Sequence, residues 1–290
     1  MIDISIIIVN YNTCKLTVKC IDSICKKTIG ISYEIIVVDN ASTDKSVECI
    51  RKTYPFVKII GNKENLGFGK ANNLGVEMAD GKYIFLLNSD TILLNNAPKL
   101  FFDFCELNNL RKILVGSELY NTSNEIIHSY NRFPTMLSVL FEPVLRRFKS
   151  RMIHTEYPIN VDYVTGADLF MQKKLFQDIG GFDKNIFLYY EETDLQKRMS
   201  EIGVERLIIN TPRIVHLVGG SNERENKVSL TEIFSIQSQH YYFKKHYNRL
   251  YYIIYRFLFF FFRIPVIFKR KLSYADTKKL LLALLYRVKC

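Results

Sequence analysis

Four short apolar segments decide the fold: residues 4–9 (ISIIIV), 34–38 (EIIVV), 57–60 (VKII) and 83–87 (YIFLL). Their apolar residues are largely consecutive rather than alternating, and helix-like segments separate them. Strands of this kind are buried on both faces, as in a parallel sheet that is covered by helices on each side. The sequence therefore predicts an α/β fold.

Three helices are expected between these strands. The first runs from Thr13 to about Lys27, and the second is capped by Ser42 or Thr43 and ends near Thr53. The third follows the glycine-rich turn 65–69 and has Ala71, Leu74 and Met78 on one face.

Polar residues follow the strands of the predicted sheet, namely Tyr11, Asp39, Asn65 and Asp90. Ligands of open α/β sheets bind beyond the carboxyl ends of the strands, so we expect these side chains at one rim. An aromatic ring, two carboxylates and a glycine turn suit a nucleotide. Asp39 could equally form a turn that leads into the next helix. No G-x-G-x-x-G follows the first strand and no GxxxxGK[ST] is present, so neither a dinucleotide site nor a P-loop is predicted.

The positive charge of the chain lies at its C-terminal end. Residues 237–290 contain 12 Lys and Arg against one acid, Asp276, which gives a net charge of +11, the same as for the whole chain. Residues 1–236 are therefore neutral overall. This distribution argues against a nucleic-acid partner and favours an anionic surface that the C-terminal segment meets.

The cysteines and the N-terminus indicate a cytosolic protein. No CxxC pair occurs among the six cysteines, so reduced and mostly buried thiols are expected. The N-terminus has an acid and no basic region, which is typical of a strand and not of a signal peptide.

Five segments, taken in order, resemble the family 2 glycosyltransferases, and most of all the bacterial rhamnosyltransferase-like members of cell-surface polysaccharide pathways. These segments are 37–44 (VVDNASTD), 65–75 (NLGFGKANNLG), 86–91 (LLNSDT), 180–195 (GGFD…YYEETDL) and 215–221 (VHLVGGS). The resemblance implies a GT-A fold over residues 1–222, with a nucleotide-binding half (1–100) and an acceptor half (101–222), followed by a helical tail (223–290). It also implies a nucleotide-diphosphate sugar donor, a divalent cation and inversion at the anomeric carbon.

The resemblance also implies roles for single residues. Tyr11 and Asp39 would contact the nucleobase and ribose, with Asn65 beside them. Asn88, Ser89 and Asp90 stand in place of the DxD motif of the family, so Asp90 and His216 would hold Mg²⁺ or Mn²⁺ on the diphosphate. His216 could instead be a histidine satisfied in the core.

An inverting transfer needs a base that takes the proton of the acceptor hydroxyl. In the family this base is the second acid of a Glu-Asp pair, which corresponds here to Glu192, after Glu191. Glu191 and Asp194 remain alternatives, although Asp194 can pair with Arg198 at i,i+4. The buried stripe of this helix would be Leu195, Met199 and Ile202.

Residues 166–168 would line the sugar or acceptor pocket by resemblance, and Asp168 could equally be a turn acid. Acceptor recognition would lie in residues 117–160, which include a helix-like segment at 137–148.

The tail contains an aromatic segment at residues 250–268 with arginines every seven residues: Arg249, Arg256, Arg263 and Arg270. This pattern predicts a helix in a membrane interface with its basic side toward anionic headgroups, kinked or interrupted at Pro265. A second amphipathic helix is expected at 278–289. The alternatives are an aromatic homodimer interface and a helix packed on the catalytic domain.

The sequence thus predicts an inverting glycosyltransferase, peripheral on the inner face of the cell membrane. It would move a sugar, first of all rhamnose, from a dTDP- or UDP-linked donor to a lipid-linked glycan acceptor. A sugar nucleotidyltransferase and a non-catalytic, membrane-docked partner of a glycan-assembly complex remain open as alternatives.

Overall fold

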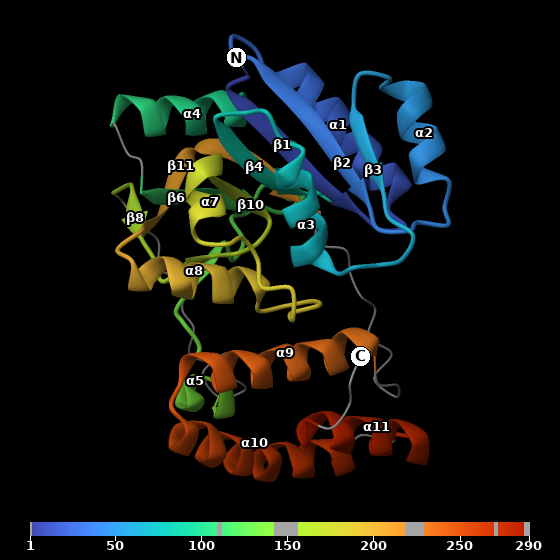
Figure 1. The fold of residues 1–290 in the computed structure, drawn as a ribbon, viewed down its shortest axis with the longest axis vertical. Helices are drawn as coiled ribbons and strands as arrows, with labels where there is room; N and C mark the ends of the chain where they lie inside the picture. Colours follow the sequence, from blue (N-terminus) through green and yellow to red (C-terminus); the bar gives the residue numbers. More distant parts are fainter. Residues whose placement is uncertain (1, 109–111, 142–155, 218–228, 270–271, 287–290) are drawn as a thin grey trace. The chain divides into compact units, whose positions relative to one another are not determined.

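The computed structural model describes residues 2–108, 112–141, 156–217, 229–269 and 272–286, in two compact units (Figure 1). Unit 1 comprises Met1–Phe133, His154–Asn185 and Glu192–Gly219. Unit 2 comprises Pro134–Ile153, Ile186–Glu191 and Gly220–Cys290.

Unit 1 is built on a mixed sheet with the strand order β3-β2-β1-β4-β10-β6-β11-β5, in which β8 also pairs with β11. Its strands are β1 (Ile4–Asn10), β2 (Tyr33–Asp39), β3 (Lys58–Gly61), β4 (Tyr83–Asn88), β5 (Thr91–Leu93), β6 (Ile113–Tyr120), β8 (Ile159–Asn160), β10 (Asp168–Gln172) and β11 (Glu205–His216). A separate short pair joins β7 (Tyr130–Asn131) to β9 (Tyr163–Val164).

The predicted parallel core is confirmed. Strand β1 pairs in parallel with β2 and β4, and β2 pairs in parallel with β3. Strand β10 lies antiparallel between β4 and β6, while β6 and β11 are again parallel. The carboxyl ends of β1, β2, β4 and β11 consequently open on one edge of the sheet.

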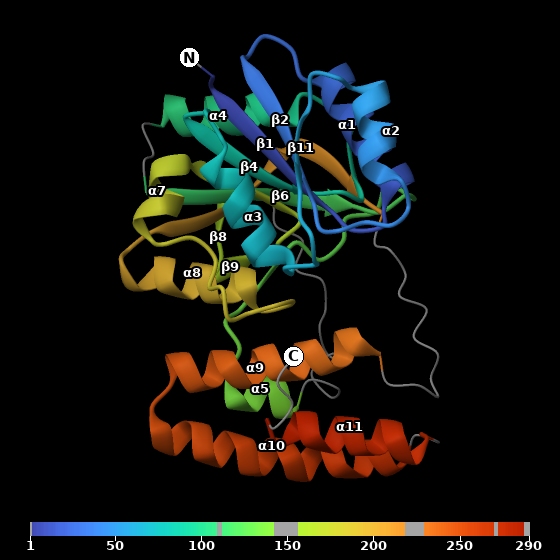
Figure 2. The ribbon, with the colours of Figure 1, turned by 45° about the vertical axis from the view of Figure 1, so that its right-hand side comes forward.

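Helices cover both faces of the sheet (Figure 2). The core of one face includes side chains from α1 (Cys14–Lys27), α2 (Ser46–Thr53) and α4 (Ala97–Leu107). That of the other face includes side chains from α3 (Phe68–Glu77), α7 (Lys173–Asp178) and α8 (Glu191–Glu201). Both cores have fully buried isoleucines of β1, with Ile6 on one side and Ile7 on the other, which explains the continuous apolar sequence of this strand.

Several expectations for the helices were wrong. Helix α2 starts at Ser46, and Ser42 does not cap it, because the Ser42 hydroxyl accepts hydrogen bonds from Asn10 and Asn12. Met78 follows α3 and is 57% exposed. The helix instead packs on the sheet through small residues: a Cβ at Gly75 would lie 2.5 Å from Ile7 Cγ2.

The described cysteines are all free thiols. The expectation of mostly buried cysteines holds for Cys20 and Cys105, whereas Cys14, Cys25 and Cys49 are partly exposed. Cys290 lies outside the described residues.

Unit 2 is helical, with α5 (Met136–Leu140), α9 (Leu230–His246), α10 (Arg249–Lys269) and α11 (Tyr274–Leu284) around an aromatic core. Of the two outcomes expected at Pro265, a kink or an interruption, the interruption was wrong, because helix α10 continues past this residue. A proline removes one hydrogen bond, and the buried Ile267 anchors the next turn. The expected helix at 278–289 begins earlier, because the Ser273 hydroxyl caps α11 by accepting from the Asp276 amide. The predicted helix at 137–148 corresponds to α5, and residues 142–148 lie outside the described residues.

Among the described residues, no helix combines the length and the apolar character needed to cross a membrane.

Candidate active site

The loops that follow β1 and β2 are tied together by side chains. Asp39 is only 3% exposed. Its carboxylate accepts a 2.6 Å hydrogen bond from Asn10 Nδ2 and a 3.0 Å hydrogen bond from the Ser42 amide. The Asn12 side chain accepts from the Thr43 amide at 2.8 Å. These loops therefore form one continuous structure at the edge of the sheet.

Tyr11 and Asp39 lie at this edge with different accessibility. Tyr11 follows β1 and is 48% exposed, so its ring is open to solvent. Asp39 ends β2, and its bond to Ser42 is the turn contact that the sequence allowed as an alternative. The Asp39 carboxylate thus has a structural role whether or not it also binds a ligand.

The glycine-rich turn joins the same edge. The Asn65 side chain accepts a 2.9 Å hydrogen bond from the Gly67 amide, and the Gly67 carbonyl accepts a 3.1 Å bond from Asn40 Nδ2. Gly67 has φ +82°, a left-handed backbone that favours glycine, directly before α3 begins. Asn65 therefore stabilises the turn, and the turn contacts Asn40, the residue directly after Asp39.

Asp90 and His216 meet because β5 pairs antiparallel with the end of β11, with His216 opposite Thr91. His216 Nε2 lies 3.1 Å from Asp90 Oδ1, and the Leu217 amide donates to the Asp90 carbonyl at 2.8 Å. Both side chains keep some exposure, 20% and 17%. His216 is the last residue of β11, so it lies at the end of the strand rather than in the core.

This pair could supply two ligands to a divalent cation. A carboxylate oxygen and an imidazole nitrogen form a donor set that suits Mn²⁺, with Mg²⁺ preferring oxygen alone. No group of three or more His, Cys, Asp or Glu that could hold a metal occurs among the described residues. A cation held by this pair would need its remaining ligands from a bound molecule and water.

Asn88 connects this region to the segment before β10. The Asn88 amide donates to the Ala167 carbonyl at 3.0 Å, and its own carbonyl accepts from the Thr91 hydroxyl at 2.8 Å. Gly166, the residue before Ala167, faces Glu192. A Cβ at Gly166 would lie 3.8 Å from Cβ, Cγ and Cδ of Glu192. The short segment Gly166–Ala167 therefore lies between Glu192 and Asn88.

Glu192 is the second residue of α8 and is half-buried. Burial raises the pKa of its carboxyl above the usual range, against a smaller opposing effect from the backbone amides of Glu192 and Thr193. A carboxylate with a raised pKa accepts a proton more readily, which is the property required of a general base.

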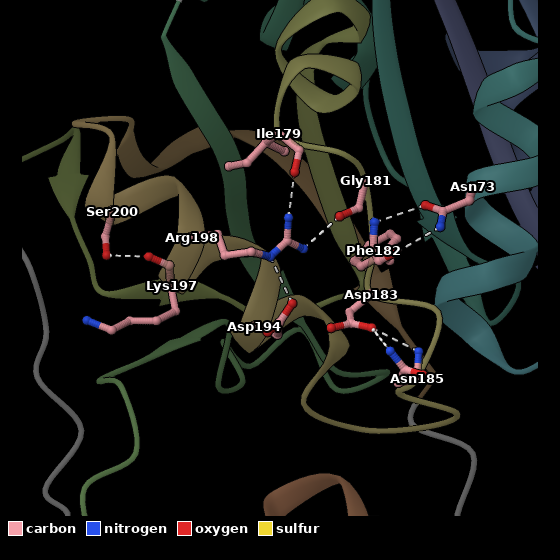
Figure 3. A network of polar contacts seen from close by, with 10 residues as sticks. All are labelled: Asn73, Ile179, Gly181, Phe182, Asp183, Asn185, Asp194, Lys197, Arg198 and Ser200. Carbon is pink, nitrogen blue, oxygen red and sulfur yellow. Dashed lines mark hydrogen bonds and ion pairs between the residues drawn. The ribbon is translucent and has the colours of Figure 1, made fainter. Parts of the chain in front are cut away.

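The other two acids of this helix are more deeply buried. Glu191 is 4% exposed and Asp194 is 0% exposed. Arg198 Nε donates to Asp194 Oδ2 at 3.0 Å, and its other nitrogens donate to the carbonyls of Ile179 and Gly181 at 2.7 and 2.6 Å (Figure 3). Asp194 and Arg198 therefore fasten α8 to the segment around Gly181.

The same segment is also fastened to α3. The Asn73 side chain donates to the Phe182 carbonyl and accepts from the Phe182 amide, both at 2.9 Å (Figure 3). The pairing of Asp194 with Arg198 that the i,i+4 spacing predicted is confirmed. The bonds from Arg198 to the two carbonyls and from Asn73 to Phe182 were not predicted, although both residues lie within or beside two of the quoted segments. In the expected stripe of α8, Leu195 and Met199 are buried, but Ile202 is 53% exposed because it lies just beyond the helix end.

Asp168 lies neither in a turn nor on an open pocket wall. It begins β10, is 0% exposed, and accepts from the amide and hydroxyl of Ser117 at 2.7 and 2.6 Å. Burial raises the pKa of the Asp168 carboxyl to about 7.

With this geometry established, comparison with known proteins identifies the family. The family model described as "Glycosyl transferase family 2" matches residues 5–180, more than half of the chain. The chain belongs to this family. The E. coli protein named chondroitin synthase is 29% identical over 214 residues, which are 67% of this chain and 30% of that protein. The Mycobacterium tuberculosis protein named N-acetylglucosaminyl-diphospho-decaprenol L-rhamnosyltransferase is 22% identical over 213 residues, which are 66% of this chain and 68% of that protein.

Solved structures confirm the GT-A-like fold of this family 2 chain. GalNAc-T7, crystallised with UDP, GalNAc and Mn²⁺, aligns with a TM-score of 0.60 at 17% identity, over 84% of this chain and 50% of that one. Residues 1–349 of S. aureus TarS in complex with UDP align with a TM-score of 0.58 at 16% identity, over 98% of this chain and 71% of that one.

Proposed function

We propose that this chain transfers a sugar, with inversion, from a dTDP- or UDP-linked donor to a glycan acceptor. The observation that carries the proposal is the meeting of Asp90 and His216, 3.1 Å apart, at the edge that also carries Tyr11 and Asp39. Membership of glycosyl transferase family 2 and the nucleotide complexes of two structural neighbours support it.

Each residue has a separate task in this proposal. Tyr11 offers an exposed ring for stacking on the nucleobase, with Asp39 and Asn65 positioned beside it. Asp90 and His216 would hold Mn²⁺ or Mg²⁺, with Asn88 in the same loop. When bound, such a cation stabilises the negative charge of the departing diphosphate. Glu192 takes the proton of the acceptor hydroxyl as its oxygen attacks the anomeric carbon.

The finer specificity is proposed from relatives. The M. tuberculosis relative is named for an L-rhamnosyl donor and a decaprenol-linked acceptor, which supports rhamnose and a lipid-linked glycan here. A lipid-linked acceptor lies at a membrane, so we place this enzyme on the inner face of the cell membrane during surface polysaccharide assembly.

Calorimetry and turnover assays test this function together. The wild-type protein is titrated with dTDP, UDP and GDP, each with and without Mn²⁺, and we expect one nucleotide to bind with the metal. Glu192→Gln keeps the size of the side chain and should retain that binding while turnover falls about 10²–10⁴-fold. The exposed Glu64→Gln variant, located before the glycine turn, serves as the matched control. Near-normal turnover of Glu192→Gln removes Glu192 as the base, and nucleotide binding without any turnover in the wild type favours a non-catalytic role.

A further inference from the structure

Helix α10 of unit 2 exposes a continuous apolar stripe, consisting of Leu250, Ile253, Ile254, Phe257 and Phe261. These side chains are 42–68% exposed. Their spacing of three, four and seven residues places them on one face of a helix with about 3.6 residues per turn. Large apolar side chains clustered in this way mark a surface that meets another apolar phase.

The opposite face of α10 is occupied within unit 2. Tyr252, Tyr255 and Phe259 are at most 9% exposed and surround His240 of α9, with ring centroids 5.4–6.3 Å from it. The Tyr255 ring also stacks on Phe243 of α9 at 4.1 Å. The helix is therefore held by its aromatic inner face, and the apolar stripe is not needed for that packing.

Arginines run along one flank of the apolar stripe. Arg249, Arg256 and Arg263 lie about 120° round the helix from the centre of the stripe, because seven-residue steps nearly complete two turns. The Arg256 guanidinium lies 5.7 Å from the Tyr252 ring centre and donates to the Leu285 carbonyl, and that of Arg263 lies 5.3 Å from the Phe259 ring centre. The expected placement of the basic side toward anionic headgroups stays a prediction. The outward face is apolar, and the basic row borders it.

A neighbouring segment of unit 2 also exposes apolar side chains. Phe141, directly after α5, is 42% exposed, and its ring contacts Phe262 of α10 at 5.6 Å. Leu137 of α5 is 63% exposed.

We propose that the apolar stripe of α10 docks onto the interface of an anionic phospholipid bilayer. An interfacial helix buries its apolar face below the headgroups while flanking basic side chains reach the phosphates. The basic excess of residues 237–290 matches a negative headgroup layer, whose attraction adds to apolar burial. A second copy fits less well, because a symmetric pair would bring two strongly basic segments together. This proposal does not depend on the transfer reaction.

Vesicle flotation of the full chain tests the proposal. Wild-type protein is mixed with phosphatidylcholine vesicles, with or without about one-third phosphatidylglycerol, and its partition coefficient is measured. The Phe257→Glu/Phe261→Glu variant places charge in the stripe and should lower partitioning about tenfold or more. The matched control, Met78→Glu/Leu107→Glu, changes side chains of unit 1 that are 57% and 85% exposed, and should partition like the wild type. Arg249→Glu should weaken binding to the anionic vesicles more than to the neutral ones.

Circular dichroism and melting curves confirm that each variant is folded before its partitioning is compared. Equal partitioning of the stripe variant and wild type would overturn the proposal, as would failure of the wild type to bind anionic vesicles. Light scattering measures the oligomeric state of the same proteins. A wild-type dimer that the stripe variant converts to a monomer, with no vesicle binding by either protein, would assign the stripe to a second copy instead.

Discussion

Replacing Arg198 with methionine should strongly destabilise unit 1, because methionine keeps an unbranched apolar stem but lacks the guanidinium group. The substitution removes the guanidinium from the Asp194 carboxylate, which is 0% exposed, and removes the donors to the carbonyls of Ile179 and Gly181. Breaking a buried ion pair from one side costs about 3–5 kcal/mol, because the remaining buried charge loses the opposite charge that offsets its desolvation. We expect a loss of this size in the free energy of unfolding.

Urea unfolding at neutral pH measures the loss, and the chain supplies a matched control. Lys174 and Asp178 form an i,i+4 pair at 2.9 Å, like Arg198 and Asp194, but their side chains are 80% and 56% exposed. Lys174→Met should therefore change the stability by no more than about 0.5 kcal/mol. A similar loss in both variants would show that burial does not control the energy of the Arg198 pair.

A double-mutant cycle separates the ion pair from the carbonyl contacts. Asp194→Asn removes the buried charge, so the double variant with Arg198→Met should be more stable than the sum of single losses predicts, by at least about 1 kcal/mol. Strict additivity would refute the argument. The folded double variant should also retain more turnover than Glu192→Gln, because the structure gives Asp194 a positioning contact and no open face.

Asp168, Gly75 and His216 each give a further prediction. Burial raises the pKa of Asp168 to about 7, so the folded state keeps a proton that the unfolded state releases above about pH 4, and stability falls as the pH rises through this window. Asp168→Asn should gain up to about 4 kcal/mol relative to wild type between pH 4 and pH 8, and a constant difference in urea unfolding would contradict this. Gly75→Ala forces a Cβ to 2.5 Å from Ile7 and should cost about 1–3 kcal/mol in thermal unfolding, whereas Gly61→Ala, with nothing within 4 Å, should cost little. His216→Ala should raise the Mn²⁺ concentration needed for half-maximal nucleotide binding about tenfold or more, and an unchanged value in metal titrations would remove His216 from the cation site.

The local pattern of the sequence was sufficient to predict the first half of the sheet. Apolar runs such as residues 4–9 are strands, and the parallel pairs β1–β2 and β2–β3 each join strands separated by one helix. The position of β10 was not predictable in this way, because its antiparallel partners β4 and β6 are set by long-range pairing rather than by its own five residues. Helix ends were missed where a side chain has a tertiary partner, as Ser42 has in the β1 loop.

The candidate site was predictable in its positions but not in its contacts. Residues after strand ends could be expected at one edge, and the structure brings Asp90 and His216 together there. Their roles in the reaction stay predictions. The bonds from Arg198 to the Ile179 and Gly181 carbonyls could not be read from the sequence, since backbone acceptors leave no residue-type signal.

The hydrogen bonds between the β1 and β2 loops have a consequence for the kinetics and thermodynamics of ligand binding. Asn10, Asn12, Ser42 and Asp39 hold these loops in one arrangement before any ligand arrives. A ligand that docks beside Tyr11 therefore meets a preorganised wall and does not have to order these loops itself. Association there should resemble rigid docking, with a rate set by encounter rather than by loop closure.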